Sequence, residues 1–319
     1  MKKVTILIPV YNEGANLPAL REALLPLIDN QLTPEPYEWE VLMVNDGSLD
    51  NSAEIMTGMR ISDSRFSDLN LSRNFGKELA MLAGMDYAQG DAVVIMDADL
   101  QHPISVVPQM IAEWEAGFQD VYGRRESRDY QSPLSRAMSK LYYKALKKST
   151  RLDILPGAGD FRLLDRICVD ALRRVRETQR NTKGLFCWIG YRKKEIPFRC
   201  EERHDGKSSF TFSRLLELAI DGITSFTTAP LRFATYMGFL SALVSLIYLI
   251  FIIVKTIFIG EPVQGFPTIM CTILFLGGCQ LISIGIIGEY IGRIFKETKG
   301  RPPYLADTFR GKPVDNNKN

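Results

Sequence analysis

The amino-acid sequence predicts an α/β protein with a doubly wound sheet, followed by amphipathic helices and a two-helix transmembrane hairpin. Three observations support this prediction. Short apolar runs alternate with segments of helical spacing in the first part of the chain, as in folds with helices on both faces of a sheet. Polar motifs directly follow several of these runs. Towards the end of the chain lie two long apolar runs, and no charged side chain occurs in the core of the first, Met237–Val254, or in the second, Phe266–Ile287.

The predicted strands and helices follow one another in a regular order. Val4–Val10 reads VTILIPV, a nearly continuous apolar run typical of a parallel strand covered on both faces. A helix is expected over Asn16–Ile28 and a second buried strand over Trp39–Val44. The next elements are a helix over Ser52–Met59, a strand over Phe66–Leu71, a helix over Lys77–Ala88 and a strand over Ala92–Met96. This alternation is the pattern of a doubly wound sheet.

Polar motifs stand where three of these strands end. They are YNE at Tyr11–Glu13, NDGS at Asn45–Ser48 and DADLQHP at Asp97–Pro103. In open α/β sheets, ligands bind beyond the carboxyl ends of the strands. We therefore expect the three motifs to form one composite site.

Asp97 and Asp99 form a D-x-D pair directly after the last of these strands. Alternate residues of an extended segment project to the same side, so the two carboxylates repel each other unless a cation joins them. Mg²⁺ or Mn²⁺, bound by one or two carboxylates and by diphosphate oxygens, is the usual solution. A lone D-x-D also occurs in solvated loops, but its place at a strand end favours a metal site.

Two further polar residues of these motifs, Asp46 and His102, each allow more than one interpretation. Asp46 lies in the NDGS turn, where its carboxylate can accept hydrogen bonds from a base or ribose. It can equally cap a helix or form an Asx-turn, and both interpretations stay open. His102 precedes Pro103 and is expected to shape the turn rather than to bind metal.

Composition and missing motifs exclude several classes of protein. A formal net charge of +2 argues against general nucleic-acid binding. The five cysteines form no CxxC pair, which fits a reduced, cytosol-facing domain better than a zinc protein. No G-x-x-x-x-G-K-[ST] occurs, and no G-x-G-x-x-G follows the first strand, so P-loop and dinucleotide phosphate cradles are missing. A G-x-S-x-G nucleophile elbow and a signal-peptide pattern are also not found.

Two long apolar runs predict a helical hairpin in a membrane. Leu231–Ile259 and Phe266–Ile287 are each long enough to cross a bilayer core, which takes about 20 apolar residues as a helix. Buried helices of a soluble protein are the alternative. The connector Gly260–Gly265 carries no Lys or Arg, whereas basic residues recur from Arg293 onward. Because Lys and Arg accumulate on the cytoplasmic side, both chain ends are expected there.

Segments before the first run have the pattern of amphipathic helices. Ser132–Ser149 places apolar residues at helical spacing among basic ones, which suits an anionic membrane surface. An ordinary surface helix with a solvated basic face is the alternative. Phe212–Phe226 is a second candidate, and it leads into the first span.

Five segments, in this order, resemble the inverting GT-A glycosyltransferases of family 2: IPVYNE, VNDGS, LSRNFGKE, MDADLQHP and GDFRLLDR. With the later segment FLGGCQLISIGIIGEYIGR, they resemble more narrowly the polyprenyl-phosphate glycosyltransferases, such as dolichol-phosphate mannose synthase and the bactoprenol glucosyltransferases. The resemblance covers nearly the whole chain. It implies a GT-A doubly wound mixed sheet, which is Rossmann-like.

The resemblance also implies roles for individual residues. Asp99, Asp160 and Arg125 would be catalytic, and Asp99 with Gln101 would hold Mg²⁺ or Mn²⁺ against the diphosphate. Asp160 would orient the acceptor or an arginine, unless it caps a helix over Arg162–Val169. The nucleotide-sugar would contact Pro9, Tyr11, Glu13, Asp46, Asp97, Ala98, Asp99 and Gln101. The acceptor and phosphates would contact Arg125, Arg162, Arg203 and Lys207.

One of these segments departs from the pattern of the family. RHDGKSSF, which begins at Arg203, resembles R-x-x-G-x-(S/T)-(K/Y)-(Y/F). Ser209 stands where Lys or Tyr is usual, and Lys207 comes two positions earlier. Whether Lys207 reaches a phosphate is therefore left open.

The function implied is transfer of one sugar to undecaprenyl phosphate at the cytoplasmic face of the bacterial inner membrane. Glucose from UDP-glucose is the sugar that the subgroup suggests; N-acetylglucosamine, galactose, mannose and aminoarabinose stay open. A homo-oligomer is expected, with a downstream flippase and a lumenal glycosyltransferase as functional partners, the product serving cell-envelope or O-antigen glycosylation. A processive polysaccharide synthase is disfavoured because no Q-x-x-R-W segment occurs, and an inactive membrane scaffold because Asp46, Asp97, Asp99 and Gln101 are intact.

The predicted organisation has four parts. Residues 1–209 would form the cytoplasmic GT-A domain, and 210–230 a juxtamembrane amphipathic helix. Residues 231–294 would form the two transmembrane helices, and 295–319 a cytoplasmic tail.

Overall fold

The computed structural model describes residues 1–125, 158–178, 180–199, 229–259 and 265–316. They fall into two compact units, Met1–Leu215 with Pro302–Asn319, and Leu216–Arg301. The amphipathic helices predicted within 132–149 and 212–226 lie outside the described residues. The same holds for Arg203 and Lys207.

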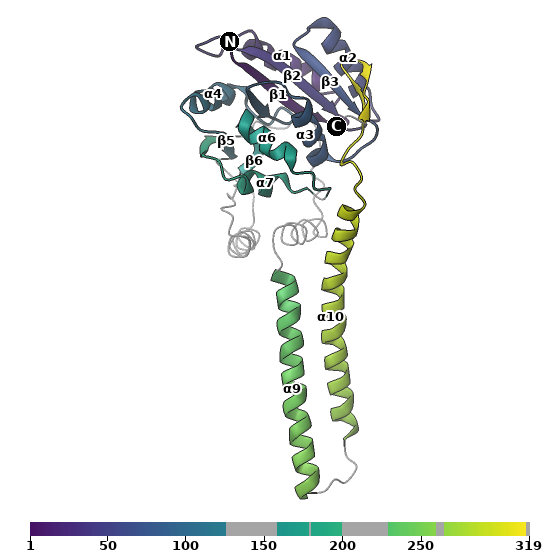
Figure 1. Ribbon diagram of the computed structural model, residues 1–319. Helices are drawn as coiled ribbons and strands as arrows, with labels where there is room; N and C mark the ends of the chain where they lie inside the picture. The colour runs from purple at the N-terminus through teal and green to yellow at the C-terminus, as the bar shows by residue number, and fades with distance from the viewer. Residues whose placement is uncertain (126–157, 179, 200–228, 260–264, 317–319) are drawn as a thin grey trace. The chain divides into compact units, whose positions relative to one another are not determined.

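A nine-stranded mixed sheet forms the centre of the first unit (Figure 1), in the order β7-β5-β6-β4-β1-β2-β3-β8-β9. The strands are β1 (Lys3–Val10), β2 (Glu38–Asn45), β3 (Phe66–Leu71), β4 (Ala92–Ile95), β5 (Asp120–Arg125), β6 (Ala158–Asp165), β7 (Lys193–Phe198), β8 (Ala306–Phe309) and β9 (Lys312–Pro313). β1 pairs in parallel with β2 and β4, and β2 with β3. β6 runs antiparallel to both β4 and β5. The predicted mixed α/β sheet is confirmed.

Helices cover both faces of this sheet. On one face, α1 (Leu17–Ile28), α2 (Ser52–Ser62) and α4 (Val107–Glu115), the last entered through the 3₁₀ helix η1 (Ile104–Val106), share a buried apolar cluster with alternate strand residues. On the other lie α3 (Lys77–Tyr87), α6 (Arg166–Arg174) and α7 (Thr182–Trp188). Gly84 lets α3 approach β1 closely, since a Cβ there would overlap the Leu7 side chain. The sheet is therefore doubly wound.

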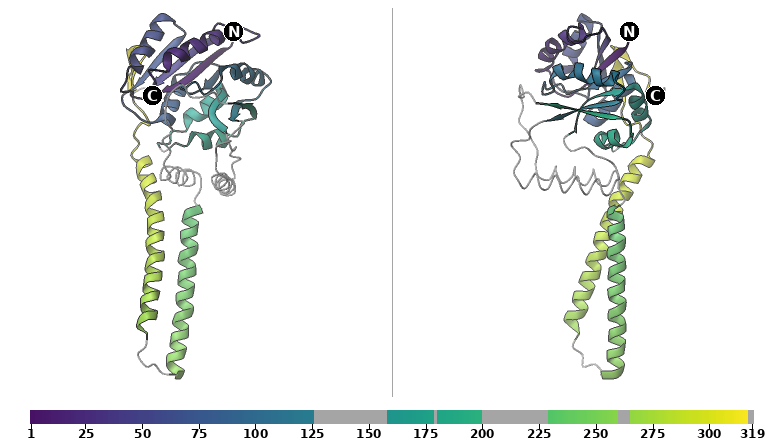
Figure 2. Two further views of the ribbon diagram at one scale, coloured as in Figure 1. Left: turned by 180° about the vertical axis from the view of Figure 1, so that it is seen from behind. Right: turned by 90° about the vertical axis from the view of Figure 1, so that its left-hand side faces the viewer.

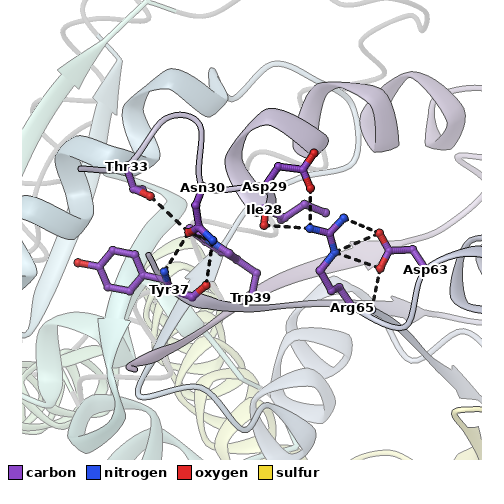
Figure 3. Close-up of polar contacts among 8 residues, drawn as sticks. All are labelled: Ile28, Asp29, Asn30, Thr33, Tyr37, Trp39, Asp63 and Arg65. Carbon is purple, nitrogen blue, oxygen red and sulfur yellow. Dashed lines mark hydrogen bonds and ion pairs between the residues drawn. The ribbon is translucent and has the colours of Figure 1, made fainter. Parts of the chain in front are cut away.

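Polar contacts fix the loops at the end of the sheet where β2 and β3 begin (Figure 3). Asn30 follows α1 with φ 58°, a left-handed conformation that ends the helix in a Schellman motif. Its Oδ1 accepts hydrogen bonds from Tyr37 N at 2.9 Å and Trp39 Nε1 at 2.8 Å. Arg65 pairs with Asp63 at 2.7 Å and also donates to the end of α1. These contacts set where β2 and β3 enter the sheet.

Asp160 does not cap a helix. It lies inside β6, and the following helix begins at Arg166, so the alternative that Asp160 caps a helix over Arg162–Val169 is excluded. Asp165 is the cap residue, because its side chain accepts a hydrogen bond from Ile167 N at 2.9 Å.

The last described residues return to the first unit and add β8 to the edge of the sheet beside β3. The sequence predicted only a cytoplasmic tail over residues 295–319. Tyr304 Oη donates to Asp86 at 2.6 Å, and Arg310 Nη2 donates to Glu40 at 2.8 Å. Pairing with β8 covers backbone groups of β3 that would otherwise be open to other strands.

Arg310→Ala is expected to lower the free energy of unfolding by about 1–3 kcal/mol, because it leaves the Glu40 carboxylate without its arginine. The Glu40 side chain is 3% exposed and that of Arg310 43%, so the lower half of the range is expected. Thermal unfolding of the full chain in detergent measures the change. Lys312→Ala, at an exposed residue of β9, is the matched control. Equal stability of the two variants would show that this ion pair does not hold the terminal strands.

Two long helices, α9 (Ala229–Ile259) and α10 (Phe266–Thr298), pack against each other in the second unit (Figure 2). They start within two residues of the predicted apolar runs. Within α10, Phe275–Thr298 is long and apolar enough to cross a membrane. The corresponding stretch of α9, Phe233–Tyr248, is shorter. The described residues thus contain one candidate span by length and composition, and a hairpin that crosses twice stays a prediction.

Candidate functional site

A cleft of about 540 Å³ lies at the carboxyl ends of β1, β2 and β4. Residues from all three strand-end motifs line it, together with the start of α3: Pro9, Val10, Tyr11, Glu13, Asp46, Asn74, Gly76, Lys77, Asp97, Ala98 and Asp99. The parallel direction of the three strands brings these motifs to one edge of the sheet.

Hydrogen bonds join the YNE and NDGS motifs. Asn12 N donates to Ser48 Oγ at 3.0 Å, and Leu49 N donates to Asn12 Oδ1 at 2.8 Å. Asn12 has φ 55°, a left-handed conformation that Asn tolerates better than most residues. The neighbouring Tyr11 stays 45% exposed, so its ring is accessible from the cleft.

Asp46 anchors the loop between β3 and α3. Its Oδ1 accepts a hydrogen bond from Phe75 N at 2.7 Å and its Oδ2 one from Gly76 N at 2.8 Å. Burial raises the pKa of Asp46, and the two amides partly oppose this. The turn at this corner is held instead by Asn45, whose Oδ1 accepts a hydrogen bond from Ser48 N, three residues on, at 2.9 Å. Each oxygen of Asp46 retains a lone pair for a further donor.

The D-x-D turn is held by its own backbone and by His102. Gln101 N donates to Asp99 Oδ1 at 3.2 Å, and Asp97 N donates to His102 Nδ1 at 3.1 Å. His102 is buried and stacks on Phe161 with ring centroids 4.7 Å apart. Burial lowers the pKa of His102, so its Nδ1 can act as an acceptor near neutral pH. His102 therefore shapes this turn.

Lys77, the first residue of α3, bridges two carboxylates. Its Nζ lies 2.6 Å from Asp97 Oδ1 and 2.9 Å from Asp160 Oδ2. Burial alone would lower the pKa of Lys77, but the two carboxylates raise it above its ordinary value. Burial alone would raise the pKa of Asp160, but the positive charges of Lys77, Lys183 and Arg162 outweigh it and hold that pKa below its ordinary value. Asp160 is therefore ionised near neutral pH.

Arg125 and Arg162, both expected to bind phosphate, lie in different surroundings. Arg125 is the exposed last residue of β5, not part of a loop, and its Nη2 donates to Gln101 Oε1 at 3.2 Å. Arg162 is 3% exposed and pairs with Asp120 at 3.0 Å, with its guanidinium 3.6 Å from the centroid of the Phe186 ring. Because the Arg162 side chain is buried and already paired, it is poorly placed to bind a phosphate from the cleft.

The D-x-D turn offers oxygen ligands of the kind that Mg²⁺ and Mn²⁺ prefer. Asp97 and Asp99 both line the cleft, and Gln101 adds an amide oxygen nearby. Among the described residues, no group of three or more His, Cys, Asp or Glu side chains could hold a metal ion. The donor set therefore fits a divalent ion that takes its remaining ligands from a bound diphosphate.

Lys77 and Asn74 line the cleft although the sequence alone predicted no role for either. Both belong to LSRNFGKE, which follows the third predicted strand as the other motifs follow theirs. The rule that placed a ligand site at three strand ends applies equally to this fourth one. Applying it to β3 would have brought both residues into the predicted cleft.

Comparison with known proteins gives consistent results. Residues 5–173 match the profile of Glycosyl transferase family 2, and residues 229–294 match the GtrB C-terminal hairpin. An uncharacterized glycosyltransferase of Synechocystis sp. is 43% identical over 309 residues, which cover 97% of this chain and 96% of the relative. A bactoprenol glucosyl transferase of Shigella phage SfV is 40% identical over 310 residues, covering 97% of this chain and 100% of the relative.

Among solved structures, the glucosyl-3-phosphoglycerate synthase of Mycobacterium tuberculosis in complex with Mn²⁺ and UDP-glucose has a TM-score of 0.44 and 18% identity, over 69% of this chain and 76% of that one. The identification depends on the family profile and on the full-length relatives. On this evidence the chain belongs to glycosyl transferase family 2 and is a glycosyltransferase that carries a GtrB-type hairpin.

Proposed function

We propose that the protein transfers glucose from UDP-glucose, with inversion, to undecaprenyl phosphate at the cytoplasmic face of the bacterial inner membrane. The main support is 40% identity to a bactoprenol glucosyl transferase over 97% of the chain. The lipid-linked glucose would then be flipped and used by a lumenal glycosyltransferase in cell-envelope or O-antigen glycosylation. A homo-oligomer stays part of this proposal.

The reaction forms one bond and breaks one bond at the anomeric carbon. An oxygen of the acceptor phosphate attacks this carbon, and UDP leaves with the electron pair of the broken bond. Because the phosphate is already anionic near neutral pH, no proton has to be removed from the nucleophile. Alignment of the two substrates and stabilisation of the charge on the departing diphosphate therefore carry the catalysis.

Residues along the cleft would bind the donor. Pro9, Tyr11 and Glu13 line it beside Asp46, where the nucleoside would lie. Asp97 and Ala98 would contact the sugar nucleotide on the other side. Asp99 with Gln101 would hold Mg²⁺ or Mn²⁺, which neutralises charge on the leaving diphosphate when bound.

The acceptor phosphate would approach from the side of Arg125, the exposed end of β5. The hydrogen bond from Arg125 to Gln101 holds the Arg125 guanidinium beside the D-x-D turn. A planar guanidinium donates two parallel hydrogen bonds to a phosphate and stays charged at any working pH. Arg203 and Lys207 are proposed to assist, and Asp160 to orient the acceptor.

Incubation of membranes with undecaprenyl phosphate and a panel of nucleotide-sugars, followed by mass spectrometry of the lipid, tests the proposal. Membranes from cells without the protein are the control. A mass increase of one hexose with UDP-glucose is expected. Modification only with another nucleotide-sugar would overturn the choice of glucose, and modification with none would overturn the proposed reaction.

The proposed topology has two transmembrane helices, α9 and α10, with the transferase unit and both chain ends in the cytoplasm. In a variant without its five cysteines, Gln264→Cys should react with an impermeant thiol reagent from outside the cell, because the connector carries no Lys or Arg. Leu49→Cys, at a side chain 90% exposed in the first unit, should react only after the membrane is opened. The reverse labelling pattern would reject this orientation.

A further inference from the structure

Lys77 joins three separate elements at the edge of the cleft. It begins α3, while Asp97 lies two residues beyond the end of β4 and Asp160 lies in β6. β4 and β6 are antiparallel neighbours, with Ile95 opposite Arg162. The two carboxylates therefore leave the same end of adjacent strands, and the ammonium of Lys77 holds both, at 2.6 and 2.9 Å.

The positive charge of Lys77 offsets the negative charges of Asp97 and Asp160, which lie close together. Two carboxylates that share one site repel each other, and a cation between them removes the repulsion. The hydrogen bond from Lys77 engages Oδ2 of Asp160, while Oδ1 of the same carboxylate is buried and has no hydrogen-bond partner among the described residues. A buried carboxylate held from one side only depends strongly on that one contact for its position.

We propose that Lys77 is a positioning residue of the transfer centre, which acts through Asp160 by holding this carboxylate at a fixed place beside the D-x-D turn. This inference rests on the proposed function, since it assigns Asp160 a part in orienting the acceptor. Lys77 also lines the cleft, so direct binding of the donor diphosphate is the competing role. The two roles differ in which kinetic constant they change.

A double-mutant cycle separates the two roles. Lys77→Met is expected to lower kcat about tenfold or more while KM for UDP-glucose stays within about threefold of wild type. In an Asp160→Asn background, the same substitution should change kcat by less than about threefold, because the residue that it positions is already lost. Lys77→Arg, which retains the charge, should recover most of the lost kcat. Lys194→Met is the matched control, since both lysine side chains are 42% exposed and Lys194 pairs with a carboxylate remote from the cleft.

Thermal unfolding of the same purified variants tests the bridge without any transfer reaction. Lys77→Met should lower Tm, because it leaves two carboxylates without their shared cation, and adding Asp160→Asn should restore part of the loss. These Tm changes, found together with a wild-type protein that transfers no glucose, would show that Lys77 bridges the two carboxylates but that the proposed function is wrong.

Three results would overturn the inference. One is a rise in KM of about tenfold with kcat unchanged, which means direct donor binding. Another is an equal loss of kcat from Lys77→Met in both backgrounds, which means that Lys77 does not act through Asp160. The third is a Tm and a turnover indistinguishable from those of Lys194→Met.

Discussion

Asp99→Asn should lower glucose transfer roughly 100-fold or more, which corresponds to a loss of at least about 2.7 kcal/mol of transition-state stabilisation. Asp99 lines the cleft at the carboxyl end of β4, where its charge would help to hold the divalent ion against the diphosphate. The fold should survive, because an asparagine oxygen can accept the same hydrogen bond that Gln101 N donates to Asp99 Oδ1. Transfer to undecaprenyl phosphate measures the loss.

Binding of the ion gives a second readout for this variant. Mn²⁺ binding in the presence of UDP-glucose, followed by electron paramagnetic resonance, should weaken in Asp99→Asn. Asp91→Asn is the control, since Asp91 lies before β4, at the opposite end of that strand, and accepts a hydrogen bond from Lys3 N at 2.8 Å. Near-normal turnover of Asp99→Asn, or wild-type turnover in excess chelator, would remove the metal from the mechanism.

Strands in the middle of the sheet could be predicted from sequence because they are buried on both faces. β1 and β4 are nearly continuous apolar runs, and burial of such runs needs no knowledge of distant residues. β8 reads ADTF and is only four residues long. Its position depends on pairing with β3, more than 200 residues earlier, which no local pattern reports. β5 and β7 also lack a continuous apolar run, because β5 ends in two exposed arginines and β7 begins with three partly exposed charged residues, so no local pattern marks them as strands.

The sequence predicted those parts of the site whose positions depend only on the direction of the strands. Parallel strands place their carboxyl ends together, and this brings Tyr11, Asp46 and Asp97 into one cleft. Side-chain partners do not follow from direction. The contact of Asp46 with a loop 30 residues away, and the bridge made by Lys77, depend on how α3 packs over the sheet. The family resemblance implied that Arg162 is a phosphate ligand, but its environment is decided by Asp120 on the neighbouring strand.

Arg162→Met is expected to cost about 3–5 kcal/mol of folding stability, because it leaves Asp120 as an uncompensated buried charge. Asp120 is 0% exposed, and both of its oxygens accept hydrogen bonds from Arg162 Nη1, at 3.0 and 3.1 Å. Burial raises the pKa of Asp120, and the charge of Arg162 opposes this shift. Chemical or thermal unfolding in detergent should therefore show a large loss, and Asp120→Asn in the same chain should recover part of it.

Arg125→Ala is expected to show the opposite effect to Arg162→Met, a loss of rate without a loss of stability. Arg125 is exposed at the end of β5, so its removal should leave Tm nearly unchanged and lower transfer about tenfold or more. A loss of stability with Arg162→Met alone, and a loss of rate at full stability with Arg125→Ala alone, would assign the first arginine to the fold and the second to the phosphates. If Arg162→Met instead retained wild-type stability and lost transfer, the pair with Asp120 would be dispensable for folding. Arg162 would then be assigned to phosphate binding.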